Sequence, residues 1–205
     1  DAQESRGLGD VYKRQIQTNT FGANRFKLAV HGLEDKVTEI NRAGVELARR
    51  VALASFKDVL IAGDVGPLGV RLAPFGRVQR EQARQAFAEQ IAALLSGGVD
   101  LLILETFSDL YELEEALAAA QAFFAQGHPA VPLVASMTFT RDDRTLLGDP
   151  PAKIATALAA AGADLVGINC SGGPAQIWRM LRLMRAAVPG MRFSVMPNAG
   201  WPEQV

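Results

Sequence analysis

The chain has 205 residues, of which 49% are apolar, and its 21 basic side chains nearly balance its 22 acidic ones, a composition typical of a globular domain with a sizeable core. No basic block favours nucleic acid as a partner, and no apolar run approaches the roughly 18 residues that cross a membrane, so we expect neither partner. The single cysteine excludes an internal disulfide and fits a reducing compartment, and the polar start lacks the apolar segment of a secretory signal, so we expect a cytoplasmic protein.

The first residues of the chain differ from the rest. Residues 1–15 show no apolar periodicity and offer little to bury. We therefore expect them to be a non-native or disordered leader, and the natural amino terminus to be absent from this sequence. Residues 16–205 are expected to form one domain.

Short apolar runs alternate with amphipathic segments along the remaining chain. Each run has the length of one buried strand, and polar or glycine-rich residues follow it. The amphipathic segments repeat apolar residues at three- and four-residue steps, as helices do. Strands are expected at 16–18, 59–62, 101–104, 133–137, 165–168 and 192–196. Helices are expected at about 33–54, 79–95, 109–126, 152–161 and 174–188.

Three of these helices carry more specific predictions. Asp109 and Glu112 are spaced as a capping box at the start of the third helix. Met180 and Met184 in the last helix are expected in the core. In the first helix the apolar steps predict one inward face, formed by Leu33, Val37, Ile40, Gly44, Leu47 and Val51.

The strict alternation of strands and helices predicts a parallel sheet with helical crossovers. An open doubly wound sheet and a closed barrel both satisfy it. No glycine-rich phosphate-binding motif follows any strand, which disfavours the nucleotide-binding open sheets. A complete (β/α)8 TIM barrel takes about 250 residues. We therefore predict an α/β fold with about six of the eight units of such a barrel, one unit being lost before Ile16 and one after Val205.

Chemically active side chains follow two of the predicted strands. Asn169 and Cys170 come directly after the strand at 165–168, and Glu105 follows four aliphatic residues. A lone cysteine is often a small buried apolar residue. At the carboxyl end of a parallel strand, where barrels place their chemistry, function becomes the better interpretation for both Cys170 and Glu105.

The strand ends together resemble those of the homocysteine S-methyltransferase family, most closely the methyltransferase half of the bifunctional homocysteine S-methyltransferase/methylenetetrahydrofolate reductases. Each motif is short, but all five occur in the family's order and spacing, and the likeness covers essentially 16–205. The motifs are Thr18-Asn19-Thr20-Phe21-Gly22-Ala23-Asn24, Gly66-Pro67, Glu105-Thr106, Gly167-Ile168-Asn169-Cys170 and Pro197-Asn198-Ala199-Gly200.

The resemblance implies a (β/α)8 barrel that transfers a methyl group to homocysteine and makes methionine. It implies a zinc ion on three cysteines, with Cys170 as the first ligand and as the catalytic residue. Glu105 matches the acid that meets the substrate's amino group, and Thr18 and Asn19 match positions that contact substrate. Asn169 is a further substrate-site candidate, although a turn asparagine is an alternative.

The chain also departs from the family pattern. The family's other two zinc ligands lie in a Gly-Gly-Cys-Cys motif after the eighth strand, and the sequence contains neither that motif nor a second cysteine. An aspartate after the family's first strand is absent too. His31 and His128 lie near helix ends and are expected at the surface. Because zinc needs three or four protein ligands, we expect this chain by itself to hold no zinc and to be inactive, and we assign the activity to the full-length parent.

The methyl donor is less determined by sequence. Methyltetrahydrofolate, acting through a cobalamin module elsewhere in a longer chain, and S-methylmethionine are both compatible with it. Betaine is disfavoured, because betaine-using members carry aromatic residues where this chain has Asn19 and Gly22.

Two other functions are compatible with the residues. One is a different TIM-barrel enzyme with a structural Cys170, although no lysine base follows a predicted strand. The other is an inactive module that only binds homocysteine. A partial barrel also exposes the edges of its first and last strands, so we expect the isolated chain to be poorly soluble.

Overall fold

The structure, a computed structural model, describes residues 14–54 and 58–198 of the chain. Residues 1–13 of the predicted leader lie outside the described residues. Gln15 is the first residue of a strand and pairs with Leu60 of the next strand. Regular structure therefore starts one residue before the predicted boundary at Ile16.

Six strands form one parallel sheet in the described part of the chain. They are β1 Gln15–Gln17, β2 Leu60–Val65, β3 Leu101–Phe107, β4 Leu133–Met137, β5 Leu165–Asn169 and β6 Arg192–Met196. Each strand pairs with the next one along the chain. All six strands were predicted. At their carboxyl ends β2, β3 and β5 extend one to three residues further than predicted, whereas β1 ends one residue earlier.

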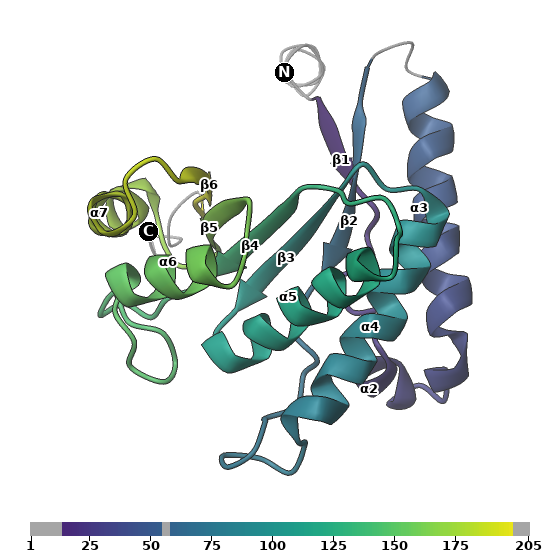
Figure 1. Cartoon of the computed structure of the whole chain (residues 1–205), viewed down its shortest axis with the longest axis horizontal. Helices are drawn as coiled ribbons and strands as arrows, with labels where there is room; N and C mark the ends of the chain where they lie inside the picture. Colours follow the sequence, from purple (N-terminus) through teal and green to yellow (C-terminus); the bar gives the residue numbers. More distant parts are fainter. Residues whose placement is uncertain (1–13, 55–57, 199–205) are drawn as a thin grey trace, which may run out of the picture.

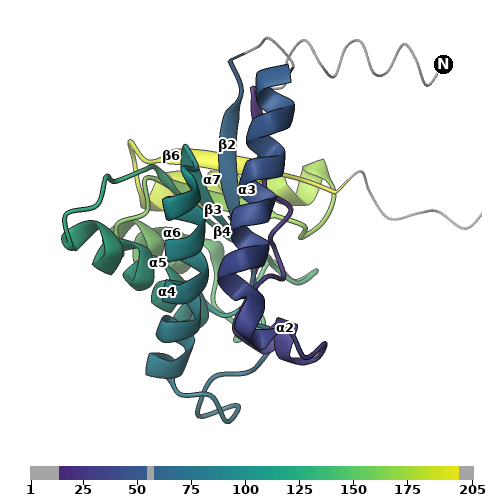
Figure 2. The ribbon, with the colours of Figure 1, turned by 90° about the vertical axis from the view of Figure 1, so that its right-hand side faces the viewer.

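Helices cover the outer side of this sheet. They are α2 Arg25–Ala29, the 3-10 helix η1 Glu34–Lys36, α3 Val37–Ala54, α4 Arg80–Gly97, α5 Leu110–Ala125, α6 Pro151–Ala160 and α7 Pro174–Ala187. The helices α3, α4 and α5 pack in sequence, and α6 packs on α7. Figure 1 shows this layer following the strands from β1 (purple) to β6 (yellow), and Figure 2 shows α3 running alongside β2.

The strand order separates the two predicted architectures. In a doubly wound sheet the order reverses at a switch point, whereas here it runs from β1 to β6 without reversal. The sheet therefore curls as a half-barrel with helices outside (Figure 1). This confirms the predicted α/β class and the incomplete (β/α)8 barrel.

The main core lies between the sheet and the helices. Phe87 of α4 and Phe107 of β3 are fully buried there with ring centroids 5.8 Å apart. Met180 and Met184 of α7 are also fully buried, as predicted. A second, smaller cluster lies on the concave side of the sheet and consists of Ala62, Leu101, Ile103 and Val134.

The predicted inward face of α3 is correct at Val37 but is displaced by about one residue along the rest of the helix. Leu47 and Val51 are 53% and 54% exposed, and the buried positions are Val37, Asn41, Val45 and Ala48. Asn41 is the reason, because its amide donates to the carbonyls of Ala23 and Val37 at 2.8 and 2.7 Å and is fully buried. A pattern of apolar residues alone does not detect a buried asparagine with satisfied hydrogen bonds.

The short helix α2 was not predicted. Asn24 caps it, since its Oδ1 accepts a hydrogen bond from the Lys27 backbone N–H at 3.1 Å. The helix places the Lys27 ammonium 4.5 Å from the centre of the Phe21 ring. A basic side chain therefore stands beside the carboxyl end of β2, where the sequence patterns indicated none.

Glu112 does not complete the predicted capping box. Asp109 caps α5 as expected, by accepting from the Tyr111 N–H at 2.9 Å. Glu112 instead turns inward and accepts from the Leu68 N–H at 2.7 Å, which ties α5 to the loop after β2. Burial raises the pKa of Glu112 to about 7, because the charged form loses its hydration.

We expect Glu112→Gln to stabilise the protein in a pH-dependent way. A carboxyl whose pKa is higher in the folded state favours folding when protonated, and this advantage is lost as pH rises from 4.5 to about 7. Glutamine keeps the acceptor for Leu68 and carries no charge. The gain in unfolding free energy should be below about 1 kcal/mol at pH 5 and about 3 kcal/mol at pH 8. Urea denaturation at both pH values measures it.

Glu46→Gln is the matched control, because Glu46 is exposed on α3 and should give no such pH dependence. An equal effect of Glu112→Gln at pH 5 and pH 8 would contradict the role assigned to burial.

Candidate active site

The alternation of side chains along the strands builds the concave face. Ile103 of β3 and Ala62 of β2 point to that side. Because strand side chains alternate with a period of two residues, Glu105 and Asp64 follow on the same side, at the carboxyl ends of their strands. Asn169 of β5 lies at the same end of the sheet. The polar layer therefore continues the small apolar cluster of the concave face.

Asn169 joins the end of β5 to the end of β3. It is 2% exposed, and its Oδ1 accepts from the Thr106 N–H at 2.9 Å. Its Nδ2 donates to Thr106 Oγ1 at 2.7 Å and reaches Cys170 Sγ at 3.5 Å. Thr106 Oγ1 lies 3.9 Å from the same sulfur. Two donors therefore face the exposed Cys170 thiol, an arrangement that suits a sulfur atom carrying negative charge.

The backbone is strained at three strand exits. Asn19 and Cys170 follow β1 and β5, and Thr106 is the last residue but one of β3. Their φ values are 57°, 54° and 63°. The left-handed region is unfavourable for a β-branched residue such as Thr106. Strain of this kind persists only where surrounding contacts enforce it, and it gathers at functional sites. Here the two Asn169 hydrogen bonds hold Thr106 in place.

The loop that carries Cys170 is held from both sides. The Cys170 N–H donates to the Met196 carbonyl at 3.3 Å, and Asn198 Nδ2 donates to the Cys170 carbonyl at 3.2 Å. Ser171 is buried and its Oγ accepts from the Phe139 N–H at 2.8 Å. The thiol is thus exposed while its backbone is fixed.

A second polar group lies at the ends of β1, β2 and β3. The hydroxyl oxygens of Thr18 and Thr20 are 2.6 Å apart, and Thr18 Oγ1 accepts from the Asp64 N–H at 3.1 Å. Asp64 lies against Glu105, whose pKa is raised by burial and lowered in part by hydrogen bonds to Gln17 and Asp64. Burial and the Glu105 charge raise the pKa of Asp64 to about 7.

The structure brings together most of the predicted site residues. Cys170 and Asn169 lie in contact, and Glu105 is half-buried next to Thr106, so both polar groups meet on β3. Thr18 is buried, with its hydroxyl engaged by protein partners, and Asn19 is exposed. Their substrate contacts stay predictions.

Sequence reasoning missed Asp64. Asp64 follows Ala62 by two residues and therefore lies on the same, concave side of β2. The predicted strand at 59–62 was too short to include it. Lys27 was missed because α2 was missed.

The described residues do not complete a metal site. No group of three or more His, Cys, Asp and Glu side chains in 14–54 and 58–198 could hold an ion. His31 and His128 are exposed, as predicted. Cys170 suits zinc as a single sulfur ligand, whereas structural and catalytic zinc sites take three or four protein ligands. The same residues contain no helix long and apolar enough to span a membrane.

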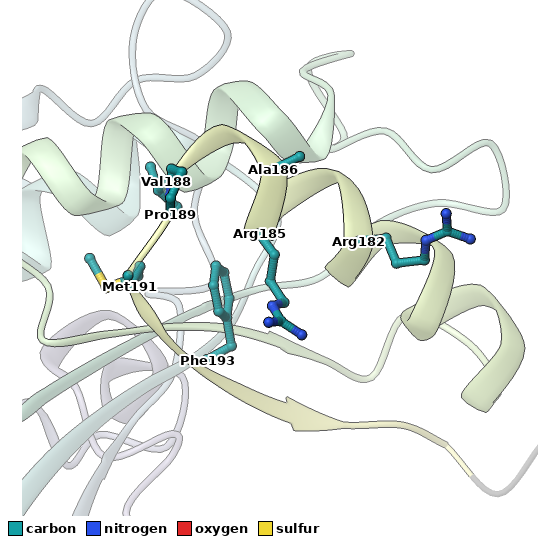
Figure 3. A pocket seen from close by; sticks show the side chains of 8 residues that line it. Arg182, Arg185, Ala186, Val188, Pro189, Met191 and Phe193 are labelled. Carbon is teal, nitrogen blue, oxygen red and sulfur yellow. The ribbon is translucent and has the colours of Figure 1, made fainter.

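The hollow drawn in Figure 3 is remote from these groups. It has a volume of about 500 Å³ and lies where the end of α7 meets the start of β6, lined by Arg185, Met191 and Phe193 among others. Because Phe193 is near the amino end of β6, the hollow opens at the opposite end of the sheet from Cys170. It does not belong to the candidate site.

Comparison with known proteins adds to this geometry. The family model described as homocysteine S-methyltransferase matches residues 12–205. The methionine synthase of Mycobacterium tuberculosis is 33% identical over 192 residues, which are 91% of this chain and 16% of that protein. Betaine--homocysteine S-methyltransferase 1 of Danio rerio is 35% identical over 175 residues, which are 84% of this chain and 41% of that protein. The chain thus spans less than half the length of these relatives.

A solved structure is also similar to this chain. The metallated form of the homocysteine methyltransferase MmuM from Escherichia coli superposes with a TM-score of 0.76 at 25% identity, over 91% of this chain and 67% of that one. The similarity to a betaine-named enzyme does not support the expectation that betaine is disfavoured. The methyl donor stays open among the three candidates.

Proposed function

Because the chain belongs to the homocysteine S-methyltransferase family, we propose that it is the homocysteine-binding part of an enzyme that transfers a methyl group to homocysteine and makes methionine. The observation that carries this proposal is the exposed Cys170 thiol at the end of β5, faced by Asn169 and Thr106. This is the place where a parallel barrel collects its reacting groups.

Cys170 is proposed as one ligand of a zinc ion, with the remaining ligands coming from outside these 205 residues. Zinc bound to thiolates activates a further thiol by favouring its deprotonated form. Asn169 acts as a positioning residue, because it holds Thr106 and faces the sulfur. The metallated form of the Escherichia coli relative supports the presence of a metal. A cytoplasmic location remains part of the proposal.

Glu105 is proposed to bind the ammonium group of homocysteine. It is half-buried on the concave face, and its neighbour in the chain, Thr106, lies 3.9 Å from the Cys170 sulfur. A carboxylate that pairs with the ammonium fixes the approach of the substrate sulfur. Thr18 and Asn19 complete the proposed substrate side.

The test uses the protein expressed from its complete natural reading frame. Purified protein is incubated with zinc, homocysteine and each of three donors in turn, namely methyltetrahydrofolate with cobalamin, S-methylmethionine and betaine. Zinc-dependent methionine formation with one donor supports the proposal and identifies that donor. Homocysteine binding without methionine from any donor would instead support a binding module.

The 205-residue chain tested by itself should hold no zinc and form no methionine, because it contains one cysteine. Metal analysis of the purified chain checks this, and one equivalent of tightly bound zinc would contradict it.

A further inference from the structure

A buried carboxyl group with an unpartnered oxygen lies beside Glu105 on the concave face. Asp64 is 5% exposed, and among the described residues no hydrogen-bond donor faces its Oδ1. Buried polar atoms nearly always have a partner, so an exception needs an explanation. A ligand that brings its own donor is one explanation, and the surroundings of Asp64 favour it.

The position of Asp64 is fixed by the end of β1. The Asp64 N–H donates to Thr18 Oγ1 at 3.1 Å, and its carbonyl accepts from Thr20 Oγ1 at 2.8 Å. Both backbone groups of Asp64 are thus tied to two buried threonines. The carboxyl cannot leave the concave face without breaking these contacts.

Asp64 and Glu105 form an acid pair. Asp64 pairs with Ile103 in the register of the sheet, and Glu105 follows Ile103 on the same face of β3, so the two carboxyl groups are neighbours. Burial and Glu105 raise the pKa of Asp64 to about 7, while the Lys27 ammonium on α2 and the Phe21 N–H lower it in part. At neutral pH the pair therefore carries a proton on about half of the molecules.

We propose that Asp64 and Glu105 bind the substrate's ammonium group together, with Asp64 Oδ1 accepting one of its N–H donors. The inference rests on the proposed function, which makes homocysteine the substrate, and it adds a second carboxylate to that subsite. An ammonium group has three donors and can bridge two carboxylates. It supplies the donor that Oδ1 lacks.

Binding of the ammonium group then displaces the Asp64 proton to solvent. No covalent bond forms or breaks, and the ammonium charge takes over the neutralising role of that proton. Because Asp64 is about half protonated at pH 7, homocysteine should release up to about half a proton from this pair. The affinity for homocysteine should fall as pH drops below 7, since protonated Asp64 attracts the ammonium less strongly.

The test compares two thiols that differ only in the amino group. Calorimetric titration in buffers of different ionisation enthalpy counts the protons released when L-homocysteine or 4-mercaptobutyrate binds to the protein from the complete reading frame. Binding of 4-mercaptobutyrate can release only the thiol proton. The difference in the number of protons released by the two ligands at pH 7 therefore measures the protons released from the ammonium subsite. We expect a difference of up to about half a proton in the wild type.

Asp64→Asn should abolish that difference and weaken homocysteine binding by about 10- to 100-fold. Binding of 4-mercaptobutyrate should be unchanged, which also shows that the variant is folded. Glu112→Gln is the matched control, because Glu112 has a similarly raised pKa but is not among the groups that act on Asp64. Glu112→Gln should leave the affinity and the proton release of both ligands at their wild-type values.

Equal loss of affinity for both thiols in Asp64→Asn would overturn the inference, because it would indicate a structural role. Wild-type affinity and proton release in that variant would also overturn it. If the proton difference appears as expected but no donor yields methionine, the proposed function fails while this inference stands. If the wild type binds no homocysteine, both fail.

Discussion

Cys170→Ser is expected to reduce methyl transfer to homocysteine by more than about 100-fold in the protein expressed from its complete reading frame. Serine keeps the size of the side chain and the left-handed backbone at φ 54°, so the variant removes the sulfur and little else. Loss of the proposed metal ligand should exceed the 10- to 100-fold cost that is usual for groups that hydrogen-bond to metal ligands. Initial rates of methionine formation and the zinc content of the variant measure the effect.

The same substitution should barely change stability. Cys170 is exposed, and its carbonyl and N–H keep their bonds to Asn198 and Met196. The unfolding free energy should therefore stay within about 0.5 kcal/mol of the wild type. A Cys170→Ser protein that retains both zinc and activity would refute the metal-ligand role, and a large loss of stability would make the activity result uninformative about it.

Asn169→Ala is expected to destabilise the protein by about 2–4 kcal/mol. The change removes two hydrogen bonds to Thr106 and leaves a threonine in the left-handed region at φ 63° without its restraint. Activity should fall by about 10- to 100-fold, because the group that positions Thr106 and the Cys170 sulfur is lost. Urea denaturation and initial rates measure the two effects.

Thr106→Gly provides the matched test of this strain. Glycine adopts a positive φ at no steric cost, so the double variant Asn169→Ala/Thr106→Gly should be more stable than Asn169→Ala by about 1 kcal/mol or more. Asn169→Asp keeps the acceptor for the Thr106 N–H but loses the amide N–H groups that face Thr106 Oγ1 and Cys170 Sγ. This variant should be less active than the wild type. If Asn169→Ala and the double variant were equally stable, the strain at Thr106 would not be held by Asn169.

Much of the fold could be predicted because the strands are short apolar runs. The ranges 133–137 and 192–196 match the structure, since Thr138 follows the first run and Pro197 ends the second. The face of α3 could not be predicted in the same way, because Asn41 is buried through hydrogen bonds rather than through apolar contact. The capping box predicted for Glu112 was wrong for a related reason. The spacing of Glu112 from Asp109 is typical of a capping box, but its carboxylate accepts from Leu68 in a loop that is distant in sequence.

The candidate site was predictable at the level of positions and less so at the level of contacts. Cys170, Asn169 and Glu105 were found because they directly follow apolar runs. The role of Thr106 depends on its positive φ, which could not be predicted because β-branched residues rarely adopt this conformation. Asp64 depends on the length of β2 and on a neighbour from another strand, and such neighbours follow from the register of the sheet rather than from local sequence.

The exposure of a single thiol has a practical consequence. Because the chain contains one cysteine and that residue is exposed where β5 ends, a maleimide fluorophore attaches at one known atom without prior removal of other reactive groups. The dye then sits beside Asn169 and Thr106, so its emission reports directly on the arrival of small molecules at this end of the barrel.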